Sequence, residues 1–433
     1  MRFIIRGGKP LRGEIKLAGS KNGTTNLMVA TLLTDEPCTL HNFPLIGDTE
    51  ITAELCRKIG STITVRDGTA AIHTPEIRQS KVTELSRRNR IPILAMGPLL
   101  ARAGEAEVPI LGGDKLGPRP VNFHLDALHA MGAEVEVTKE SYRARVPHGL
   151  RGAAILLPFP SVGATQTTIL AAVCAKGNTV LQNAALEPEI VSMVKMLQNM
   201  GAIIEFGANR DIYIEGVQKL HGAVHEVIPD RNEAVSFACL ALATGGEIFV
   251  RGAIQEHLIT FLNVVRRLGG EYRVVSGGIV FSRTGALKAL DVETTRHPGF
   301  MSDWQQPLAV LLTQTHGTSH IHETIYEDRF GYAEDLRALG AHIGVSTECP
   351  AHRPCRFGGK GFNHLAELQG PVELKSDGKE FRVRDLRSGM IDVTAALVSK
   401  GETKIEGVEE IDRGYERIDE RLRALGADIR REI

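Results

Sequence analysis

A short pattern that recurs six times constrains the fold of this chain more than any other feature. Two aliphatic side chains about one helical turn apart precede a glycine, and a stretch of alternating apolar and polar residues follows it. The six glycines are Gly60, Gly132, Gly201, Gly269, Gly340 and Gly426. Glycine readily adopts the left-handed conformation that ends a helix, and alternation is typical of a half-buried strand. Each copy is therefore predicted to be a helix, a glycine cap and a strand.

The spacing of these glycines indicates the size of the repeated unit. Successive glycines lie 68 to 72 residues apart, except for the last pair, which lies 86 residues apart. This period is too long for an ordinary solenoid repeat and suits a small folded α/β module. The longer last interval predicts an insertion.

A second series of glycines keeps the same period and is expected to open a strand after an apolar helix. Its members are Gly104, Gly177, Gly246, Gly317 and Gly401. Residues 169–173 and 234–243, which precede two of them, are rich in Ala and apolar on every side, which predicts helices that are buried all round. We therefore expect helices on the inside of the molecule and sheets on the outside.

Composition sets limits on domain number and on partners. A chain of 433 residues with 42% hydrophobic content is long enough for two domains or more, each with its own core. The formal net charge of −1 gives no indication of nucleic acid or of an anionic membrane as a partner. Residues 1–8 do not resemble a signal peptide, and no segment reaches the roughly 20 apolar residues of a membrane span, so a cytoplasmic protein is expected.

The cysteines raise the question of a metal site. Most of the six occur in apolar contexts, where a reduced core thiol is the ordinary interpretation. Cys349, His352 and Cys355 lie close together, as zinc ligands do, but a fourth ligand is missing and two prolines intervene. A plain insertion around Cys349 to Phe362, with no metal and no assigned function, is the favoured interpretation.

Nucleotide-cofactor motifs are absent, and polar residues at breaks in the pattern are the candidates for function. Neither G-x-G-x-x-G after a strand nor G-x-x-x-x-G-K-[ST] occurs, so no cofactor is expected. Lys21 and Asn22 precede an apolar helix, as do the small residues 161–165. Each segment would bind an anion if the helix start points at it. A plain helix cap is the favoured interpretation for Lys21 and Asn22, and it explains residues 161–165 equally well.

The loop at residues 111–120 combines glycines and prolines with Asp114, Lys115 and Arg119. Such a loop can close over a ligand, although a surface loop without chemistry is nearly as good an explanation. In the second half, Asp303, Asp385 and residues 412–417 stand ahead of helices, where acids are usually caps. These residues occur at the same phase of the repeated module, which favours a functional role in addition to capping.

Seven motifs in colinear order resemble the UDP-N-acetylglucosamine enolpyruvyl transferase family, over residues 7–429. They are Ser20–Asn22, Gly117–Val121, Ser161–Thr165, Glu187–Val191, Pro229–Arg231, Asp385–Arg387 and Ile411–Ile418. The resemblance implies an inside-out α/β barrel of two domains, each of three βαβαββ repeats with buried helices. The catalytic domain would comprise residues 1–20 and 230–433, and residues 21–229 would form the second domain, which carries the mobile loop 111–120.

The resemblance also implies a reaction. Enolpyruvyl would pass from phosphoenolpyruvate to the 3-hydroxyl of UDP-N-acetylglucosamine with release of phosphate, as the first committed step of peptidoglycan synthesis and hence of cell-wall formation and division. Addition followed by elimination needs a base at the hydroxyl, an acid at C3 of the enol, and cations around the phosphate and carboxylate.

The residue roles follow from matching motifs. Asp303 would be the base, Asp385 would lie beside the reacting centre, and Asp114 would serve as the acid or in product release. Lys21, Arg119 and Arg413 would bind phosphoenolpyruvate, and Arg387 would lie near it. The residues expected to hold the UDP-sugar are Asn22, Arg90, Pro120, Val121, Asn122, Phe123, His124, Ser161, Val162, Gly163 and Ile325.

The chain departs from the family pattern at several positions. Asp114 stands where most members have a Cys, so its pKa should rise on loop closure, and the enzyme should be insensitive to fosfomycin, which alkylates that thiol. Phe159 occupies a site that is often Lys, which removes one expected diphosphate contact, and residues 230–234 lack a Thr that is common after the Glu.

Two alternative functions are weighed against the leading one. An enolpyruvylshikimate-phosphate synthase would have Lys followed by Ser, whereas this chain has Lys21 followed by Asn22. A paralogue that binds a sugar nucleotide without catalysis would have no need of the base Asp303. The expected partners are phosphoenolpyruvate and UDP-N-acetylglucosamine.

Overall fold

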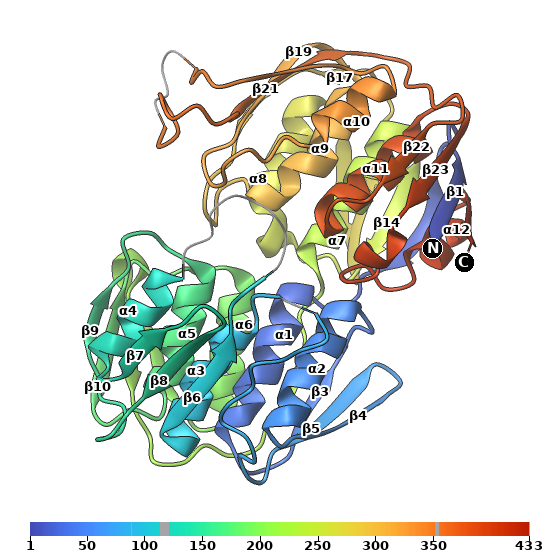
Figure 1. Cartoon of the computed structure of the whole chain (residues 1–433). Coiled ribbons are helices and arrows are strands. Elements are labelled where there is room, and N and C mark those ends of the chain that lie inside the picture. The colour runs from blue at the N-terminus through green and yellow to red at the C-terminus, as the bar shows by residue number, and fades with distance from the viewer. Residues whose placement is uncertain (88, 113–120, 351–354, 433) are drawn as a thin grey trace. The chain divides into compact units, whose positions relative to one another are not determined.

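The computed structural model describes residues 1–87, 89–112, 121–350 and 355–432, which divide into two compact units (Figure 1). The terminal unit comprises residues 1–18 and 229–432, and the inserted unit comprises residues 19–112 and 121–228. Each unit has its own hydrophobic core. Five residues that the sequence analysis singled out, Asp114, Lys115, Arg119, Pro120 and His352, lie outside the described residues.

Three buried helices form the centre of the inserted unit. They are α1 (Lys21–Ala30), α3 (Pro92–Ala103) and α5 (Val162–Ala172). The outer helices are α2 (Gly47–Ile59), α4 (Asn122–Ala130) and α6 (Pro188–Asn199). One sheet has the order β13 (Val224–Glu226), β3 (Cys38–His41), β5 (Thr69–His73), β4 (Thr62–Arg66). A second has the order β6 (Glu105–Pro109), β8 (Ser141–Arg145), β7 (Glu134–Val137), and a third β11 (Ile203–Phe206), β12 (Ile212–Glu215), β10 (Asn178–Gln182), β9 (Ala154–Leu156).

The terminal unit has a corresponding centre of α7 (Arg231–Thr244), α9 (Gln305–Leu312) and α11 (Leu386–Val398). Its outer helices are α8 (Gln255–Leu268), α10 (Ala333–Ala338) and α12 (Ile418–Ala424). Two sheets have the orders β22 (Glu380–Arg382), β23 (Glu402–Glu406), β1 (Arg2–Arg6), β24 (Asp428–Glu432) and β15 (Glu271–Val275), β16 (Gly278–Ser282), β14 (Glu247–Arg251), β2 (Arg12–Lys16). The third is β17 (Leu287–Lys288), β19 (Thr315–His322), β21 (Leu365–Gly370), β20 (His342–Ser346), with β18 (Asp291–Glu293) also on β19.

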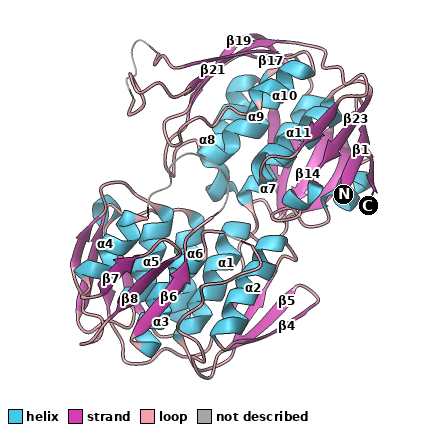
Figure 2. Ribbon diagram, in the orientation of Figure 1, coloured by secondary structure: helices cyan, strands magenta, loops and turns pink. Residues whose placement is uncertain are grey.

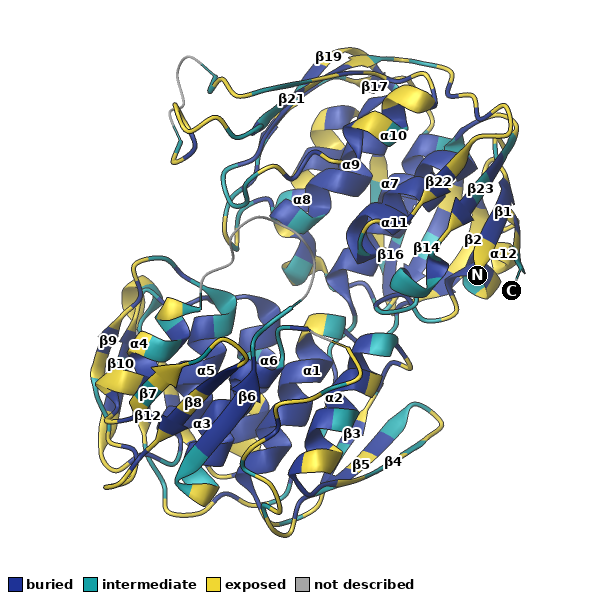
Figure 3. Cartoon of the chain, in the orientation of Figure 1, coloured by how far each residue is buried: buried dark blue, intermediate teal, exposed yellow. Residues whose placement is uncertain are grey.

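The central helices are buried on nearly every side, as their composition predicts. In α7 every residue from Arg231 to Ala243 is buried, and in α11 every residue from Leu386 to Leu397. The strands, in contrast, alternate between buried and exposed side chains (Figure 3). Within each unit the three central helices thus form an inner layer, and the strands lie in an outer layer (Figure 2). No helix in the described ranges combines the length and apolar character that crossing a bilayer requires.

One sheet topology recurs through both units. In the sheet of β2, β14, β16 and β15, the first pair is parallel and the following pairs are antiparallel. The same sequence of pairings holds for β9, β10, β12 and β11. In the sheet of β6, β8 and β7 a single parallel bridge from Lys81 to Glu107 stands where the parallel strand would be.

Each unit is completed by a strand from the far end of its own sequence. β1 lies between β23 and β24, where Phe3 is opposite Ile405 on one side and Arg431 on the other. In the inserted unit β13 pairs in parallel with β3, so that Val224 is opposite Thr39. These two strands join the beginning of each unit to its end.

The six helix-ending glycines behave as the sequence predicts. All six have positive φ, from 81° at Gly269 to 138° at Gly60. The predicted strands at residues 134–137 and 203–206 are β7 and β11. The expectation that Gly317 opens a strand is wrong, because Thr315 and His316 already pair with β17 and start β19 two residues earlier. The predicted insertion is the connection between β20 and β21, residues 347–364.

Asp392 on α11 generates a prediction about pH. Its carboxyl group is buried, and its Oδ1 atom has no hydrogen-bond partner among the described residues. Burial first, and then the charge of Asp335, raise its pKa well above the ordinary value of 3.8. The folded state therefore binds this proton more tightly than the unfolded state, so the contribution of Asp392 to the free energy of unfolding falls as pH rises above about 3.8.

Asp392→Asn should consequently stabilise the protein relative to the wild type, by an amount that is absent at acid pH and grows as pH increases towards neutrality. Urea denaturation of both proteins over a pH series measures this difference. Asp428→Asn, at an exposed position of β24, is the matched control and should show no such trend. A difference between Asp392→Asn and the wild type that does not change with pH would contradict the assignment.

Candidate active site

Lys21 is the first residue of α1 and is held by a buried carboxylate. Its Nζ atom lies 2.8 Å from Oδ2 of Asp48, and the Lys21 side chain is 15% exposed. The preceding Ser20 caps the helix, because its Oγ accepts a hydrogen bond of 3.2 Å from the amide of Gly23. The Lys21 side chain thus starts from the first residue of α1, at the positive end of the helix dipole, and exposed Asn22 follows it.

The starts of α4 and α5 bring together several of the residues predicted to hold the UDP-sugar. Val121 is the N-cap of α4, and Asn122, Phe123 and His124 form its first turn. Ser161 caps α5, since its Oγ accepts a hydrogen bond of 3.3 Å from the amide of Ala164.

Gly163 follows Val162 at the start of α5 and lies directly against His124. A Cβ atom on Gly163 would come within 2.8 Å of Cε1 of His124, so a larger residue would push the two helix starts apart. The Nδ1 atom of His124 lies 2.8 Å from Oγ1 of Thr167. Burial first, and then the charge of Arg90, lower the pKa of His124 from 6.5 to about 3, so the imidazole is neutral at physiological pH.

In the terminal unit, Asp303 is held between two buried guanidinium groups. It lies in the 3-10 turn Ser302–Trp304, just before α9. Its Oδ1 accepts a hydrogen bond of 2.6 Å from Nη2 of Arg329, and its Oδ2 lies 3.6 Å from Nη2 of Arg387. The Arg329 side chain is 1% exposed and that of Asp303 is 21% exposed. Asp303 is thus a fixed carboxylate that still reaches solvent.

The two arginines remain cations in spite of their burial. For Arg387, burial alone would lower the pKa, but the charges of Asp303 and then of Tyr415 and Asp230 raise it above its ordinary value. Nη1 of Arg387 also donates to the hydroxyl of Tyr415 at 3.4 Å. Because Arg387 follows Asp385 at the start of α11, the helix start and the Asp303 turn are joined by this ion pair.

Glu323 organises the same region and was missed by the sequence analysis. It is fully buried, and its Oε2 accepts hydrogen bonds from Oγ of Ser302 at 2.8 Å and Nε2 of Gln305 at 2.6 Å. Its Oε1 accepts hydrogen bonds from the amides of Ile325 at 2.7 Å and Tyr326 at 3.0 Å. Glu323 therefore ties the turn that contains Asp303 to the segment that contains Ile325, and no local sequence pattern distinguishes it.

Two other candidates have clear structural roles. Oδ1 of Asp385 caps α11 by accepting hydrogen bonds from the amides of Arg387 at 2.8 Å and Ser388 at 3.1 Å, as the plain capping interpretation predicted. Nη1 of Arg413 lies 2.9 Å from Oε2 of Glu410, and the Arg413 side chain is largely buried. Both residues are thus fixed in position by partners close to them in the sequence.

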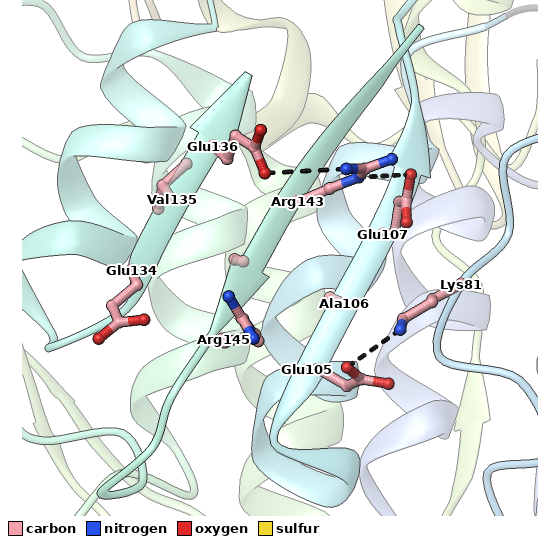
Figure 4. Close-up of a pocket in the computed structure, with 10 residues that line it drawn as sticks. Lys81, Glu105, Ala106, Glu107, Glu134, Val135, Glu136, Arg143 and Arg145 are labelled. Carbon is pink, nitrogen blue, oxygen red and sulfur yellow. Dashed lines mark hydrogen bonds and ion pairs between the residues drawn. The ribbon is translucent and has the colours of Figure 1, made fainter. Parts of the chain in front are cut away.

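A hollow on the outer face of the sheet of β6, β8 and β7 lies apart from these residues (Figure 4). Its charged side chains pair with one another. Lys81 lies 3.3 Å from Glu105, and Arg143 lies 2.8 Å from Glu107 and 3.8 Å from Glu136. None of the described residues that were predicted to bind substrate lines it. The hollow is therefore a surface of compensated charge and not the candidate site.

Among the described residues, the predicted site residues form two groups, one in each unit. Arg90, His124 and Gly163 come together in the inserted unit, and Asp303 and Arg387 in the terminal unit. Lys21 lies with Asp48, and Arg413 with Glu410. Arg329 contacts the candidate base and Glu323 contacts the turn that contains it, and neither residue was anticipated from the sequence.

Comparison with known proteins shows the family to which this chain belongs. The profile of the family EPSP synthase (3-phosphoshikimate 1-carboxyvinyltransferase) matches residues 5–422. A UDP-N-acetylglucosamine 1-carboxyvinyltransferase of Protochlamydia amoebophila is 45% identical over 98% of this chain and 93% of its own length. Proteins of the same name from Chlamydia abortus, 44% identical over 98% and 97%, and Caulobacter vibrioides, 39% identical over 99% and 97%, are also similar.

Solved structures share the fold. The enolpyruvyl transferase NikO from Streptomyces tendae superposes with a TM-score of 0.86 at 24% identity, over 99% of this chain and 98% of that one. An EPSP synthase from Acinetobacter baumannii gives a TM-score of 0.71 at 19% identity, over 99% and 100%. From its family profile and its curated relatives, this chain belongs to the EPSP synthase family and is a carboxyvinyltransferase.

Proposed function

We propose that this enzyme transfers enolpyruvyl from phosphoenolpyruvate to the 3-hydroxyl of UDP-N-acetylglucosamine and releases phosphate, the first committed step of peptidoglycan synthesis. Relatives that are 39–45% identical over nearly the full length bear the name UDP-N-acetylglucosamine 1-carboxyvinyltransferase. The observation that carries the proposal is the carboxylate of Asp303, fixed by Arg329 and Arg387 and still open to solvent. Such a group is suited to take a proton from a bound hydroxyl.

We assign different roles to the two carboxylate oxygens of Asp303 from their contacts. Oδ1 receives the short hydrogen bond from Arg329, which fixes the orientation of the carboxylate. Oδ2 lies 3.6 Å from Arg387, beyond ordinary hydrogen-bond distance, and is the oxygen that we assign to the sugar hydroxyl. A base that is held in a fixed orientation, and whose side chain still reaches solvent, is suited to receive a proton from a bound hydroxyl.

We assign the anionic substrate to cations at the ends of buried elements. Lys21 and Arg413, together with Arg119, would bind the phosphate and carboxylate of phosphoenolpyruvate, with Asp385 beside the reacting centre. The partners Asp48 and Glu410 hold Lys21 and Arg413 in place before substrate arrives. Preorganised cations of this kind stabilise charge that develops in the transition state.

The UDP-sugar is assigned to the starts of α4 and α5, with Asn22, Arg90, Pro120 and Ile325. Amide groups at a helix start suit phosphate oxygens, and Gly163 has no side chain that could cover them. Because His124 is neutral, it can offer a hydrogen bond without adding charge beside Arg90. We further propose that the enzyme is cytoplasmic and needs no cofactor.

We also propose a finer description of the fold of each unit. We interpret each unit as an inside-out α/β barrel of three βαβαββ repeats, and the catalytic domain as residues 1–20 and 230–433, with residues 21–229 as the second domain. The recurring sheet topology and the buried central helices support this interpretation, while the sheets themselves are separate and unclosed.

Release of phosphate from phosphoenolpyruvate tests the substrate. UDP-N-acetylglucosamine should support release and shikimate 3-phosphate should not. The opposite result would assign the alternative, an enolpyruvylshikimate-phosphate synthase. Binding of the UDP-sugar with no phosphate release would assign the other alternative, a paralogue that binds a sugar nucleotide without catalysis.

Asp303→Asn should lower turnover by about 10²- to 10⁴-fold, because it keeps the shape of the side chain and removes the base. Affinity for UDP-N-acetylglucosamine, measured by calorimetry, should change little, as expected when the lost interaction acts mainly in the transition state. Asp291→Asn, at an exposed edge of the same unit, is the control for a general effect of removing a carboxylate. Near-normal turnover of Asp303→Asn would end the assignment of the base.

Asp114 should make the enzyme insensitive to fosfomycin, since a carboxylate is a much poorer nucleophile than a thiolate. Asp114→Cys should gain time-dependent inactivation, with an adduct on that residue detected by mass spectrometry. Asp114→Asn, which cannot act as an acid, should lose most of its activity. Rapid covalent inactivation of the unmodified enzyme would show that Asp114 does not occupy the position of the reactive thiol.

A further inference from the structure

Four metal-ligating side chains converge where the insertion leaves and rejoins its sheet. The ligand atoms of His322, Cys349, Cys355 and His364 all lie within 4.8 Å of one another. Sγ of Cys349 lies 3.4 Å from Sγ of Cys355 and 3.2 Å from Nε2 of His364, and both cysteines are free thiols. We propose that these four residues form a structural Zn²⁺ site.

The insertion supplies three of the ligands, Cys349, Cys355 and His364, and the sheet supplies His322. His322 is the last residue of β19 and lies opposite Leu365 of β21, so His364 falls next to it at the same end of the strand pair. Cys349 and Cys355 belong to the connection between β20 and β21. A bound ion would therefore fasten the insertion to the sheet. The sequence analysis found no fourth ligand because both histidines come from outside the segment 349–355.

Both histidines are oriented as metal ligands are. Nδ1 of His322 lies 3.1 Å from Oε2 of Glu293, and Nδ1 of His364 lies 2.7 Å from the carbonyl oxygen of Phe362. These contacts fix the rings and leave Nε2 of each as the ligand atom, an arrangement that is general for zinc-binding histidines.

The Nε2 atom of His322 provides an independent reason to expect a ligand. The side chain is 4% exposed, and this nitrogen has no hydrogen-bond partner among the described residues. A buried polar atom without a partner is costly to the folded state, and coordination of a metal would remove that cost.

The donor set and its spacing favour zinc. Two sulfurs and two imidazole nitrogens are a common tetrahedral zinc set, in which two sulfurs lie about 3.8 Å apart and a sulfur and a nitrogen about 3.5 Å apart. The observed separations of 3.4 Å and 3.2 Å are within a few tenths of an ångström of these values. The amide of Phe357 also lies 3.4 Å from Sγ of Cys355, where it can stabilise a thiolate. A disulfide between the two cysteines would not explain why His322 and His364 lie beside them.

The site is structural because protein atoms fill all four positions of a tetrahedral ion. Its effect would be to order the insertion, which in turn contacts the segment around Ile325. Nη2 of Arg356 donates to the carbonyl of Ile325 and lies 3.3 Å from Glu327, and the amide of Asn363 donates to Oδ1 of Asp328 at 2.9 Å. Zinc would thus support a segment that Glu323 joins to the Asp303 turn.

Elemental analysis of the purified, untagged protein tests the proposal without any substrate, so its outcome is independent of the proposed function. The wild type should contain a single zinc ion per chain, and Cys349→Ser, Cys355→Ser and His364→Asn should fall to background. Cys174→Ser, which alters a half-buried thiol of the inserted unit, is the matched control and should retain zinc.

Substitution with cobalt keeps the test decisive if a variant folds poorly. The wild-type protein reconstituted with Co²⁺ should show thiolate-to-cobalt charge transfer and the strong visible bands of a tetrahedral ion. Removal of zinc by a chelator should expose residues 347–364 to limited proteolysis, and added zinc should restore protection. A wild-type protein with no zinc after purification and reconstitution, or one whose Cys349 and Cys355 are joined by a disulfide, would overturn the proposal.

Discussion

The enclosure of helices that have no polar face is the constraint on which the rest of this structure depends. α7 and α11 are buried along almost their whole length, so their surroundings must be apolar on every side. A β-sheet offers one apolar face, so several sheets are needed to surround such helices. Several polar groups of the candidate site lie at the helix starts, where unpaired amides need capping groups. Lys21, Ser161 and Asp385 all lie at such starts.

Buried charges near the candidate base are stable because they are paired within their own unit. Arg329 and Arg387 are compensated by Asp303, and Glu233 receives two hydrogen bonds from Arg421, at 2.7 Å and 2.8 Å. Removing one partner of such a pair leaves a buried charge without compensation, which costs more than the pair contributes. The pairs therefore fix side-chain positions more than they add to overall stability.

The sequence predicted the parts of the fold that local physics determines. Helix, glycine and strand follow one another because positive φ and alternating burial are visible in short windows of sequence. The roles of Glu323 and Arg329 were missed because their contacts join residues about 20 to 30 positions apart, which no local pattern records. The cluster of His322 and His364 was missed for the same reason, since the pairing of β19 with β21 brings them together. Gly317 shows the smaller error that an extra pairing partner introduces at a strand end.

The position of β1 has a consequence for the order in which the protein is made. β1 is synthesised before the other described strands, yet both strands that flank it lie within residues 402–432, so Phe3 and Ile5 gain these partners only after residues 7–401 have been made. The inserted unit differs, because its closing strand β13 ends at residue 226. This unit has every strand it needs when only about half of the chain exists. Synthesis therefore completes the inserted unit before the terminal unit, in which β1 waits for β23 and β24.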